Sequence, residues 1–351
     1  MTTRTDRRTL LAAASGAVLA APFIVTAARA QARRIVVRDL GIGTSFLDAY
    51  ARPFERATGI KVVPVTAQHE PAGLIRQMVE TRAYTWDMAI VSRATADQLA
   101  REGGGSIEPL GIGETAGFQA LPDMFKAPYY AANDVVATVL AYRTDKVRTP
   151  PRNWADFWDV RGRPGARAMR RFPFDTIEQA LLAHGVEPAR LYPCDFDRAF
   201  RSLDRIRRDV AVWWTSGAQT SQLLQSGEVD YCPTWNGRAQ VAINGGAPVA
   251  LMWEQALWQT EGWVILKGTP NAALCREFIA FALDPARQAV FAAATGYGPS
   301  LAKAIDVLPE ATARAMPTHP DNSRSAQLID VDFWAGSRDR AADLFNRWVV
   351  G

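Results

Sequence analysis

Between residues 34 and 91 the sequence alternates β-rich runs with amphipathic helical stretches. The pattern predicts three strands separated by two helices, at Arg34–Asp39, Phe46–Ala57, Lys61–Thr66, Ala72–Thr81 and Met88–Val91. Strands that alternate with helices in this way form a mainly parallel sheet with right-handed crossovers and with helices on its faces. The alternation therefore predicts an α/β fold.

Ligands of open α/β sheets bind beyond the carboxyl ends of the strands. Two stretches fall there: the loop Gly41-Ile42-Gly43-Thr44-Ser45 and the residue Ser92. A Gly-Thr-Ser loop that opens a helix presents free backbone N–H groups at the positive end of the helix dipole, which favours a carboxylate. Gly43, Thr44 and Ser92 are therefore candidate ligand residues.

The rest of the chain predicts a second lobe. Val135–Tyr142 is a long β-rich run, and a turn-rich stretch follows it at Thr149–Asn153. Further strands are expected at Val210–Trp214, Tyr231–Trp235, Val249–Trp253 and Gly262–Leu266. Single domains typically span about 50–250 residues, so two lobes are expected. We assign residues 31–138 plus 264–305 to lobe 1 and residues 139–263 plus 306–351 to lobe 2.

The first thirty residues read as an export signal. Arg7 and Arg8 precede an apolar run from Leu10 to Val25, and Ala28-Arg29-Ala30 provides small residues at a cleavage site. Adjacent arginines before such a run indicate the twin-arginine route, with cleavage after Ala30. The alternative is an uncleaved anchor, but the run is shorter than the ~20 residues that span a bilayer. The protein is therefore expected in the periplasm.

The basic character of the chain comes mostly from this signal. Its removal leaves 36 basic and 35 acidic residues, which gives no support to a nucleic-acid partner. Arg-rich stretches such as Arg161–Arg171 alternate with other residue types and are interpreted as solvated faces. The three cysteines and three histidines match no metal spacing, so neither a metal nor another cofactor is expected.

No nucleophile motif or phosphate-binding loop is present, so the sequence does not predict an enzyme. Tryptophans instead gather near polar and charged residues. Trp235 and Trp258 are candidates for holding an organic cation, since a ring face contributes ~0.5–2 kcal/mol to each cation contact. Trp154, Trp158 and Trp348 are interpreted as core residues.

Six stretches together resemble the periplasmic solute-binding proteins of ABC importers, in particular the spermidine/putrescine-binding branch. They are Phe54–Val62, Trp86–Ser92, Ala127–Tyr130, Trp154–Asp159, Trp235–Gly237 and Thr295–Pro299. The resemblance implies two α/β lobes, each a mainly parallel sheet flanked by helices, joined by hinge strands and closing on a solute. It also implies an ABC permease at the inner membrane as partner and a receptor that acts as a monomer.

The resemblance also implies a set of ligand residues. The positions that match the family pattern are Ser92, the acidic pair Asp175 and Glu178, the cage residues Trp235 and Trp258, and Tyr297. Other positions depart from it. Thr260 stands where an acid is usual, although Glu261 follows it, and Ala335 stands where a glutamine is usual.

A polyamine is the leading expectation for the ligand. The alternative is an ω-amino acid such as 4-aminobutyrate, because Arg238 is suited to a bidentate contact with a carboxylate. Arg238 also has the option of pairing with Asp230 instead. Two other classes remain open: a ferric-ion binder through Tyr129 and Tyr130, for which a packing role is preferred, and an exported hydrolase through Asp175 and Glu178.

Overall fold

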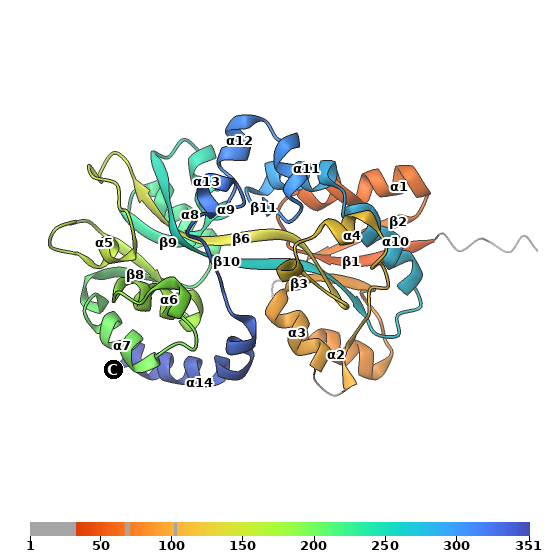
Figure 1. Ribbon diagram of the computed structural model, residues 1–351, viewed down its shortest axis with the longest axis horizontal. Coiled ribbons are helices and arrows are strands. Elements are labelled where there is room, and N and C mark those ends of the chain that lie inside the picture. The colour runs from red at the N-terminus through yellow and green to blue at the C-terminus, as the bar shows by residue number, and fades with distance from the viewer. Residues whose placement is uncertain (1–32, 67–70, 102–103) are drawn as a thin grey trace, which may run out of the picture. The chain divides into compact units, whose positions relative to one another are not determined.

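The structure is a computed structural model that describes residues 33–66, 71–101 and 104–351 (Figure 1). The predicted signal peptide and its cleavage site after Ala30 lie outside the described residues. No helix within the described ranges combines the length and the apolar character that a membrane span needs.

The strands form one mixed sheet in the order β2-β1-β3-β10-β6-β9-β7-β8. Four short strands lie off this order: β4 and β12 pair with β10, and β5 and β11 pair with β6. The strands are β1 Arg34–Asp39, β2 Lys61–Thr66, β3 Met88–Ser92, β4 Ile107–Glu108, β5 Lys126–Ala127, β6 Tyr130–Arg143, β7 Arg167–Arg170, β8 Val210–Trp214, β9 Tyr231–Trp235, β10 Val249–Leu266, β11 Gly298–Pro299 and β12 Gln327–Leu328. β1 runs parallel to β2 and β3, and β7 runs parallel to β8 and β9. The predicted α/β class is confirmed.

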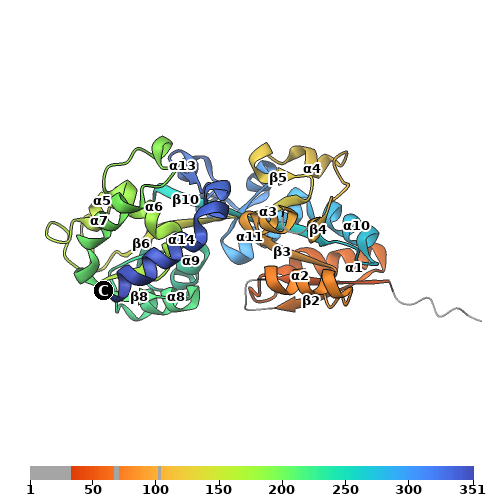
Figure 2. The same ribbon diagram turned by 90° about the horizontal axis from the view of Figure 1, so that it is seen from below.

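Helices cover both faces of this sheet (Figures 1 and 2). They are α1 Arg52–Thr58, α2 Ala72–Thr81, α3 Arg93–Arg101, α4 Ala116–Ala120, α5 Trp154–Trp158, α6 Pro173–Ala183, α7 Phe196–Asp204, α8 Gly217–Ser226, α9 Asn236–Asn244, α10 Ala272–Ala282, α11 Pro285–Thr295, α12 Glu310–Arg314, α13 Pro320–Ser323 and α14 Val331–Val350. A turn of π-helix at Leu47–Ala51 precedes α1. Side-chain caps fix several helix starts; Asp284, for example, accepts the backbone N–H of Arg287 with Pro285 in the first turn.

Residues 34–351 contain separate apolar cores around the two groups of parallel strands. We call the part of the molecule around β1–β3 the first half and the part around β7–β9 the second half. The core of the first half includes Phe54, Trp263 and Phe278. The core of the second half includes Trp154 and Phe345. Burial of each large apolar side chain contributes roughly 1.5–3 kcal/mol. The lobe boundaries given above remain a prediction.

Two long antiparallel strands, β6 and β10, pass from one half to the other. The sequence predicted separate strands at Val249–Trp253 and Gly262–Leu266, and the structure joins them into the single strand β10. The reason is the bulge between Met252 and Leu257, where Gln255 takes a φ of 58°. A bulge interrupts the alternation of side chains without ending the strand.

One interpretation of the basic stretches is wrong. Arg167, within the stretch interpreted as a solvated face, is 1% exposed. Its guanidinium donates to the carbonyl of Phe157 and lies 4.7 Å from the centre of the Tyr231 ring. Carbonyl acceptors and a ring face replace the lost water, and alternation with other residue types did not reveal them.

Candidate functional site

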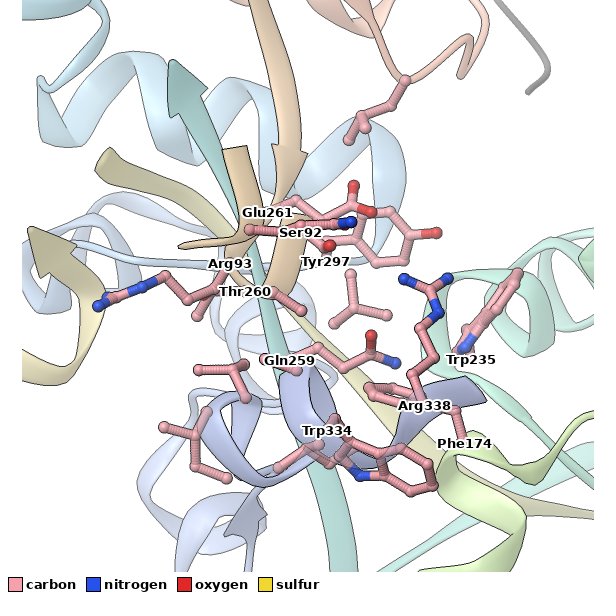
Figure 3. A pocket seen from close by; sticks show the side chains of 18 of the residues that line it. Ser92, Arg93, Phe174, Trp235, Gln259, Thr260, Glu261, Tyr297, Trp334 and Arg338 are labelled. Carbon is pink, nitrogen blue, oxygen red and sulfur yellow. The ribbon is translucent and has the colours of Figure 1, made fainter. Parts of the chain in front are cut away.

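A cavity of about 630 Å³ lies where the two halves meet, within the range typical of small-molecule sites. Its lining side chains come from both halves and from the crossing strands: Arg38, Leu40, Ile42, Ser92, Arg93, Ala94, Gln98, Asp123, Met124, Val136, Arg170, Phe172, Phe174, Trp235, Arg238, Gln259, Thr260, Glu261, Tyr297, Leu328, Ile329, Val331, Trp334, Ala335, Arg338 and Asp339. Figure 3 shows Gln259, Thr260 and Glu261 of β10 along one side and Trp334 and Arg338 of α14 along another.

Strand ends place several of these side chains, as the sheet topology predicts. Ser92 ends β3 and its hydroxyl bonds Thr95 at 2.9 Å, at the start of α3. Trp235 ends β9, and Arg238 follows in the first turn of α9. Both lie beside Gly217, where an added Cβ would come within 2.9 Å of each. A glycine is therefore needed at position 217 for this close approach.

Five of the ten predicted ligand residues line the cavity: Ser92, Trp235, Arg238, Glu261 and Tyr297. Burial raises the pKa of Tyr297; the Glu261 carboxylate raises it further, whereas the Arg238 guanidinium opposes the rise. The charges of Glu261 and Arg238 therefore both affect the pKa of the Tyr297 hydroxyl. Gly237 packs directly on the Tyr297 ring, because an added Cβ would come within 2.6 Å of it.

Asp175 lies beneath the cavity wall and is engaged by the protein. Its Oδ2 accepts from Arg170 at 2.9 Å and from Thr138 at 3.1 Å. Burial raises its pKa, and the charge of Arg170 and the Thr138 hydroxyl oppose that rise. Arg170 in turn lies 5.0 Å from the centre of the Trp235 ring. The structure thus places Asp175 behind Arg170 and not among the lining side chains.

Glu178 is also fully buried and engaged. Its Oε1 accepts from the Tyr192 hydroxyl at 2.8 Å and from the Trp334 indole N–H at 2.5 Å. Of the two carboxylates predicted to meet a ligand amine together, neither lines the cavity. The helical spacing from which a shared face was predicted does not hold, because Asp175 takes a φ of 61° at a kink near the start of α6, before the regular helical turns that carry Glu178.

The remaining predicted residues also lie off the cavity lining. Trp258 packs beside the apolar clusters of Ala137 and Val264. In the Gly41–Ser45 loop, Gly43 and Thr44 are exposed, and the Thr44 hydroxyl donates to Asp48 at 2.7 Å. The side chain of Ile42, between the two glycines, reaches the cavity instead.

Sequence reasoning missed several lining residues, above all arginines and aromatics: Arg38, Arg93, Arg170, Phe174, Gln259, Trp334 and Arg338. Trp334 and Arg338 are four residues apart on α14 and so share one face of it. A helical period over the last twenty residues would have paired them. Nothing in the sequence, however, indicates that this face of α14 lies against the first half and lines the cavity.

The cavity lining carries five arginines and three acidic residues, Asp123, Glu261 and Asp339. Arg170 is paired with Asp175 and Arg93 with Asp97. Among the described residues, the buried Nε of Arg238 has no hydrogen-bond partner. Asp230 accepts the backbone N–H of Ala166, and no ion pair between Asp230 and Arg238 occurs in the described part of the chain. Arg238 therefore lines the cavity without being held by Asp230.

A second pair of carboxylates lies at the β10 side of the cavity. Asp134 of β6 is the direct cross-strand partner of Glu261, and Asp134 is fully buried. Directly opposite residues of an antiparallel pair point to the same face. Burial raises the pKa of Asp134 well above its usual range, and Glu261 raises it further. The Asn133 amide donates to one Asp134 oxygen, and the other has no partner within the described ranges.

The residues of the other functional classes are engaged elsewhere. Tyr129 donates to Asp97 and Tyr130 to Thr260, which agrees with the packing role preferred for these tyrosines. In the described ranges no group of three His, Cys, Asp or Glu side chains is arranged for a metal. Cys194, Cys232 and Cys275 are free and buried, and burial raises the pKa of each thiol.

Comparison with known proteins agrees with this architecture. The family model for bacterial extracellular solute-binding proteins matches residues 49–318. A gamma-aminobutyric acid-binding protein of Pseudomonas aeruginosa is 36% identical over 92% of this chain and 93% of its own. A spermidine/putrescine-binding periplasmic protein of Escherichia coli is 24% identical over 84% and 85%. The solved structure of a GABA receptor superposes with a TM-score of 0.82 at 31% identity, over 90% of this chain and 98% of that one. The predicted resemblance to the solute-binding proteins is confirmed.

Proposed function

The chain belongs to the bacterial extracellular solute-binding proteins, and from this membership we propose that it binds a small ω-amino acid of the 4-aminobutyrate type for delivery to an ABC permease. The relative named for gamma-aminobutyric acid covers nearly the whole chain at higher identity than the polyamine-binding relative. The cavity of this chain supports the same ligand class independently.

The observation that carries the proposal is that one cavity is lined by Glu261, Arg238 and Tyr297, so that a carboxylate and a guanidinium are offered to the same ligand. Burial raises the pKa of Tyr297, the Glu261 carboxylate raises it further and the Arg238 guanidinium lowers it, which indicates that both charges lie near this phenol. The ammonium group of the ligand meets Glu261 with Asp134 beneath it. The carboxylate meets the donors of Arg238, because a guanidinium offers two parallel N–H groups to a carboxylate.

The same cavity disfavours a polyamine, the leading expectation from the sequence. Polyamines carry only positive charge, and this site is lined by five arginines, two of them already paired with carboxylates, against three acidic side chains. Like charges at close range in a partly dehydrated cleft repel by several kcal/mol. The acidic pair that would offset such a cation, Asp175 and Glu178, is engaged by Arg170, Tyr192 and Trp334.

Isothermal titration calorimetry with five ligands tests the proposal. 4-Aminobutyrate, butylamine and butyrate separate the contributions of the two ends, and putrescine and spermidine test the polyamine alternative. We expect measurable binding of 4-aminobutyrate only, because each half-ligand offers a charge to only one of the two unlike groups, Glu261 and Arg238. Equal or tighter binding of putrescine would contradict the proposal.

Delivery requires export, and we propose that the twin-arginine segment supplies it, with cleavage after Ala30 and action as a periplasmic monomer that closes its lobes on the ligand. The E. coli relative is named as a periplasmic protein, which supports this location. The test is a precursor carrying Arg7→Lys with Arg8→Lys. It is expected to remain in the cytoplasm, and unchanged export would contradict the route.

A further inference from the structure

A fully buried carboxylate, that of Glu178, contacts a lining residue of the cavity from inside the fold. Glu178 of α6 is 0% exposed, and its Oε1 accepts the indole N–H of Trp334. This hydrogen bond matters for binding because Trp334 itself lines the cavity (Figure 3). Glu178 therefore reaches the binding site through Trp334 and not by contact with a ligand.

Trp334 is held by few polar partners and several rings. Its ring centre lies 5.1 Å from that of Phe174, another lining residue, and 5.5 Å from that of Phe333. Such ring contacts tolerate small rotations, whereas a hydrogen bond fixes the in-plane orientation of an indole. The Glu178 bond thus decides where the indole edge points. Arg338 lies one helical turn further along the same face of α14.

We propose that Glu178 is a positioning residue of the binding site, which fixes the Trp334 indole and which, on gaining or losing a proton, loosens or tightens that wall of the cavity. The proposal rests on ligand binding in this cavity, as put forward above. In its ionised form Glu178 makes charge-assisted hydrogen bonds to Trp334 and Tyr192, which are stronger than the neutral bonds of the protonated form. The wall is therefore firmest when Glu178 is ionised.

The surroundings of Glu178 put this proton exchange in the neutral range. Burial raises its pKa to about 7, and the bonds from Trp334 and Tyr192 limit the rise. The titratable groups that face it are Asp175 on its own helix and Tyr192 and Cys194 on the segment before α7. Burial raises the pKa of Tyr192 and Cys194 far above neutral, and Glu178 raises it further.

Asp175 and Asp330 are the other nearby acids. Asp175 adds a small increase to the pKa of Glu178, and its own charge is balanced by Arg170. Asp330 caps α14 through the backbone N–H of Phe333 and raises the pKa of Cys194. Glu178→Gln removes the titration of Glu178 and leaves these neighbouring groups in place, so any pH dependence that is lost in the variant belongs to Glu178.

The first experiment needs no ligand. The protein is labelled with 5-fluorotryptophan, and the ¹⁹F resonance of residue 334 is assigned by its loss in Trp334→Phe. We expect this resonance to shift between pH 6 and pH 8 in the wild type and to stay constant in Glu178→Gln. A resonance that does not titrate, or that titrates equally in Glu178→Gln, overturns the proposal whatever the ligand is.

The second experiment measures 4-aminobutyrate affinity over the same pH range, in which the charges of that ligand do not change. We expect the wild type to bind about three- to tenfold more tightly at pH 8 than at pH 6, the factor that separates a charge-assisted from a neutral hydrogen bond. Glu178→Gln keeps the shape and an acceptor, and is expected to show the low-pH affinity throughout. Pronounced pH dependence in Glu178→Gln would overturn the role of Glu178.

A double-mutant cycle and a control complete the test. Trp334→Phe removes the indole N–H and is expected to weaken binding at pH 8 as Glu178→Gln does, with no further loss in the double variant. Tyr192→Phe removes the other donor and leaves the Trp334 bond, so its pH dependence should remain. Additive losses in the double variant would show that the two residues act separately and would overturn the proposal. Absence of any 4-aminobutyrate binding in the wild type would count against the proposed function, and the fluorine experiment would then decide the role of Glu178 by itself.

Discussion

Two pairs of carboxylates lie near the same cavity and have opposite roles. In the helix pair, Asp175 and Glu178 on α6, one oxygen of each carboxylate accepts from protein donors, and neither residue lines the cavity. In the strand pair, Asp134 and Glu261 on β6 and β10, Glu261 lines the cavity. All three buried carboxylates, Asp134, Asp175 and Glu178, keep one oxygen without a partner among the described residues. The role of a carboxylate is therefore decided by whether the fold places it on the cavity surface or behind it, and not by its residue type.

The largest effect is expected for Glu261→Gln, which tests whether the strand pair contacts the ligand. The variant removes the negative charge that faces the cavity, and removal of one partner of a buried charge pair costs ~2–5 kcal/mol. We therefore expect 4-aminobutyrate to bind roughly 30- to 5,000-fold more weakly by calorimetry. Glu254→Gln, an exposed change on the same strand, is the control and should leave the affinity unaltered. Equal affinities would mean that the strand pair does not contact the ligand.

The helix pair should instead respond in stability. Asp175→Asn removes the partner of the half-buried Arg170, and loss of one member of a buried ion pair costs about 3 kcal/mol. Urea unfolding is expected to show this loss, and the exposed change Asp197→Asn should lower the free energy of unfolding by less than ~0.5 kcal/mol. A variant as stable as the wild type would show that the Arg170 bond is not structural.

Arg238→Gln examines the cation that we propose for the ligand carboxylate. A charge-assisted bond to a ligand carboxylate contributes ~1.5–3 kcal/mol, so we expect a 10- to 100-fold loss of 4-aminobutyrate affinity. Arg208→Gln, an exposed change in the second half, is the matched control. If Arg238→Gln binds as tightly as the wild type, another lining arginine holds the carboxylate.

The smallest effect is the part that Glu178 adds to the pH dependence of folding, beside that of the other buried carboxylates. The folded protein keeps the Glu178 proton up to about pH 7, whereas the unfolded chain releases it near pH 4.5. The stabilising contribution is therefore full below pH 4.5 and is lost as the pH rises to about 7. Between pH 5 and pH 6 the free energy of unfolding should fall by roughly 1 kcal/mol more than in Glu178→Gln. Equal slopes of the free energy of unfolding against pH in the wild type and in Glu178→Gln would contradict a raised pKa of Glu178.

Much of the first half was predictable because its signals are local. The bounds of β1, β2 and α2 match the expected ranges, since alternation and helical period report on neighbours in the chain. The residues at strand ends, Ser92 and Trp235, follow from the topology of a parallel sheet. In β10 the local signal failed, because the bulge at Gln255 breaks the alternation while pairing with β6 continues on both sides.

The site was only partly predictable because its geometry depends on distant contacts. Asp175 and Glu178 have the residue types and spacing of a ligand pair, but Arg170 and Trp334 determine what they bind. Asp134 is 127 positions from Glu261 in the chain, and only the register of β6 against β10 makes them neighbours. No spacing rule within one segment detects such a pair.

Local patterns in the sequence were enough to predict the α/β class, the family and the kinds of groups available: guanidinium, carboxylate and aromatic side chains near strand ends. Which of these groups line the cavity depends on the tertiary structure. The physical reason is that the hydrogen-bond donors around each carboxylate come from segments far away in the chain. Arg170 and Trp334 reach the helix pair first, whereas the Glu261 carboxylate and the Arg238 guanidinium face the site.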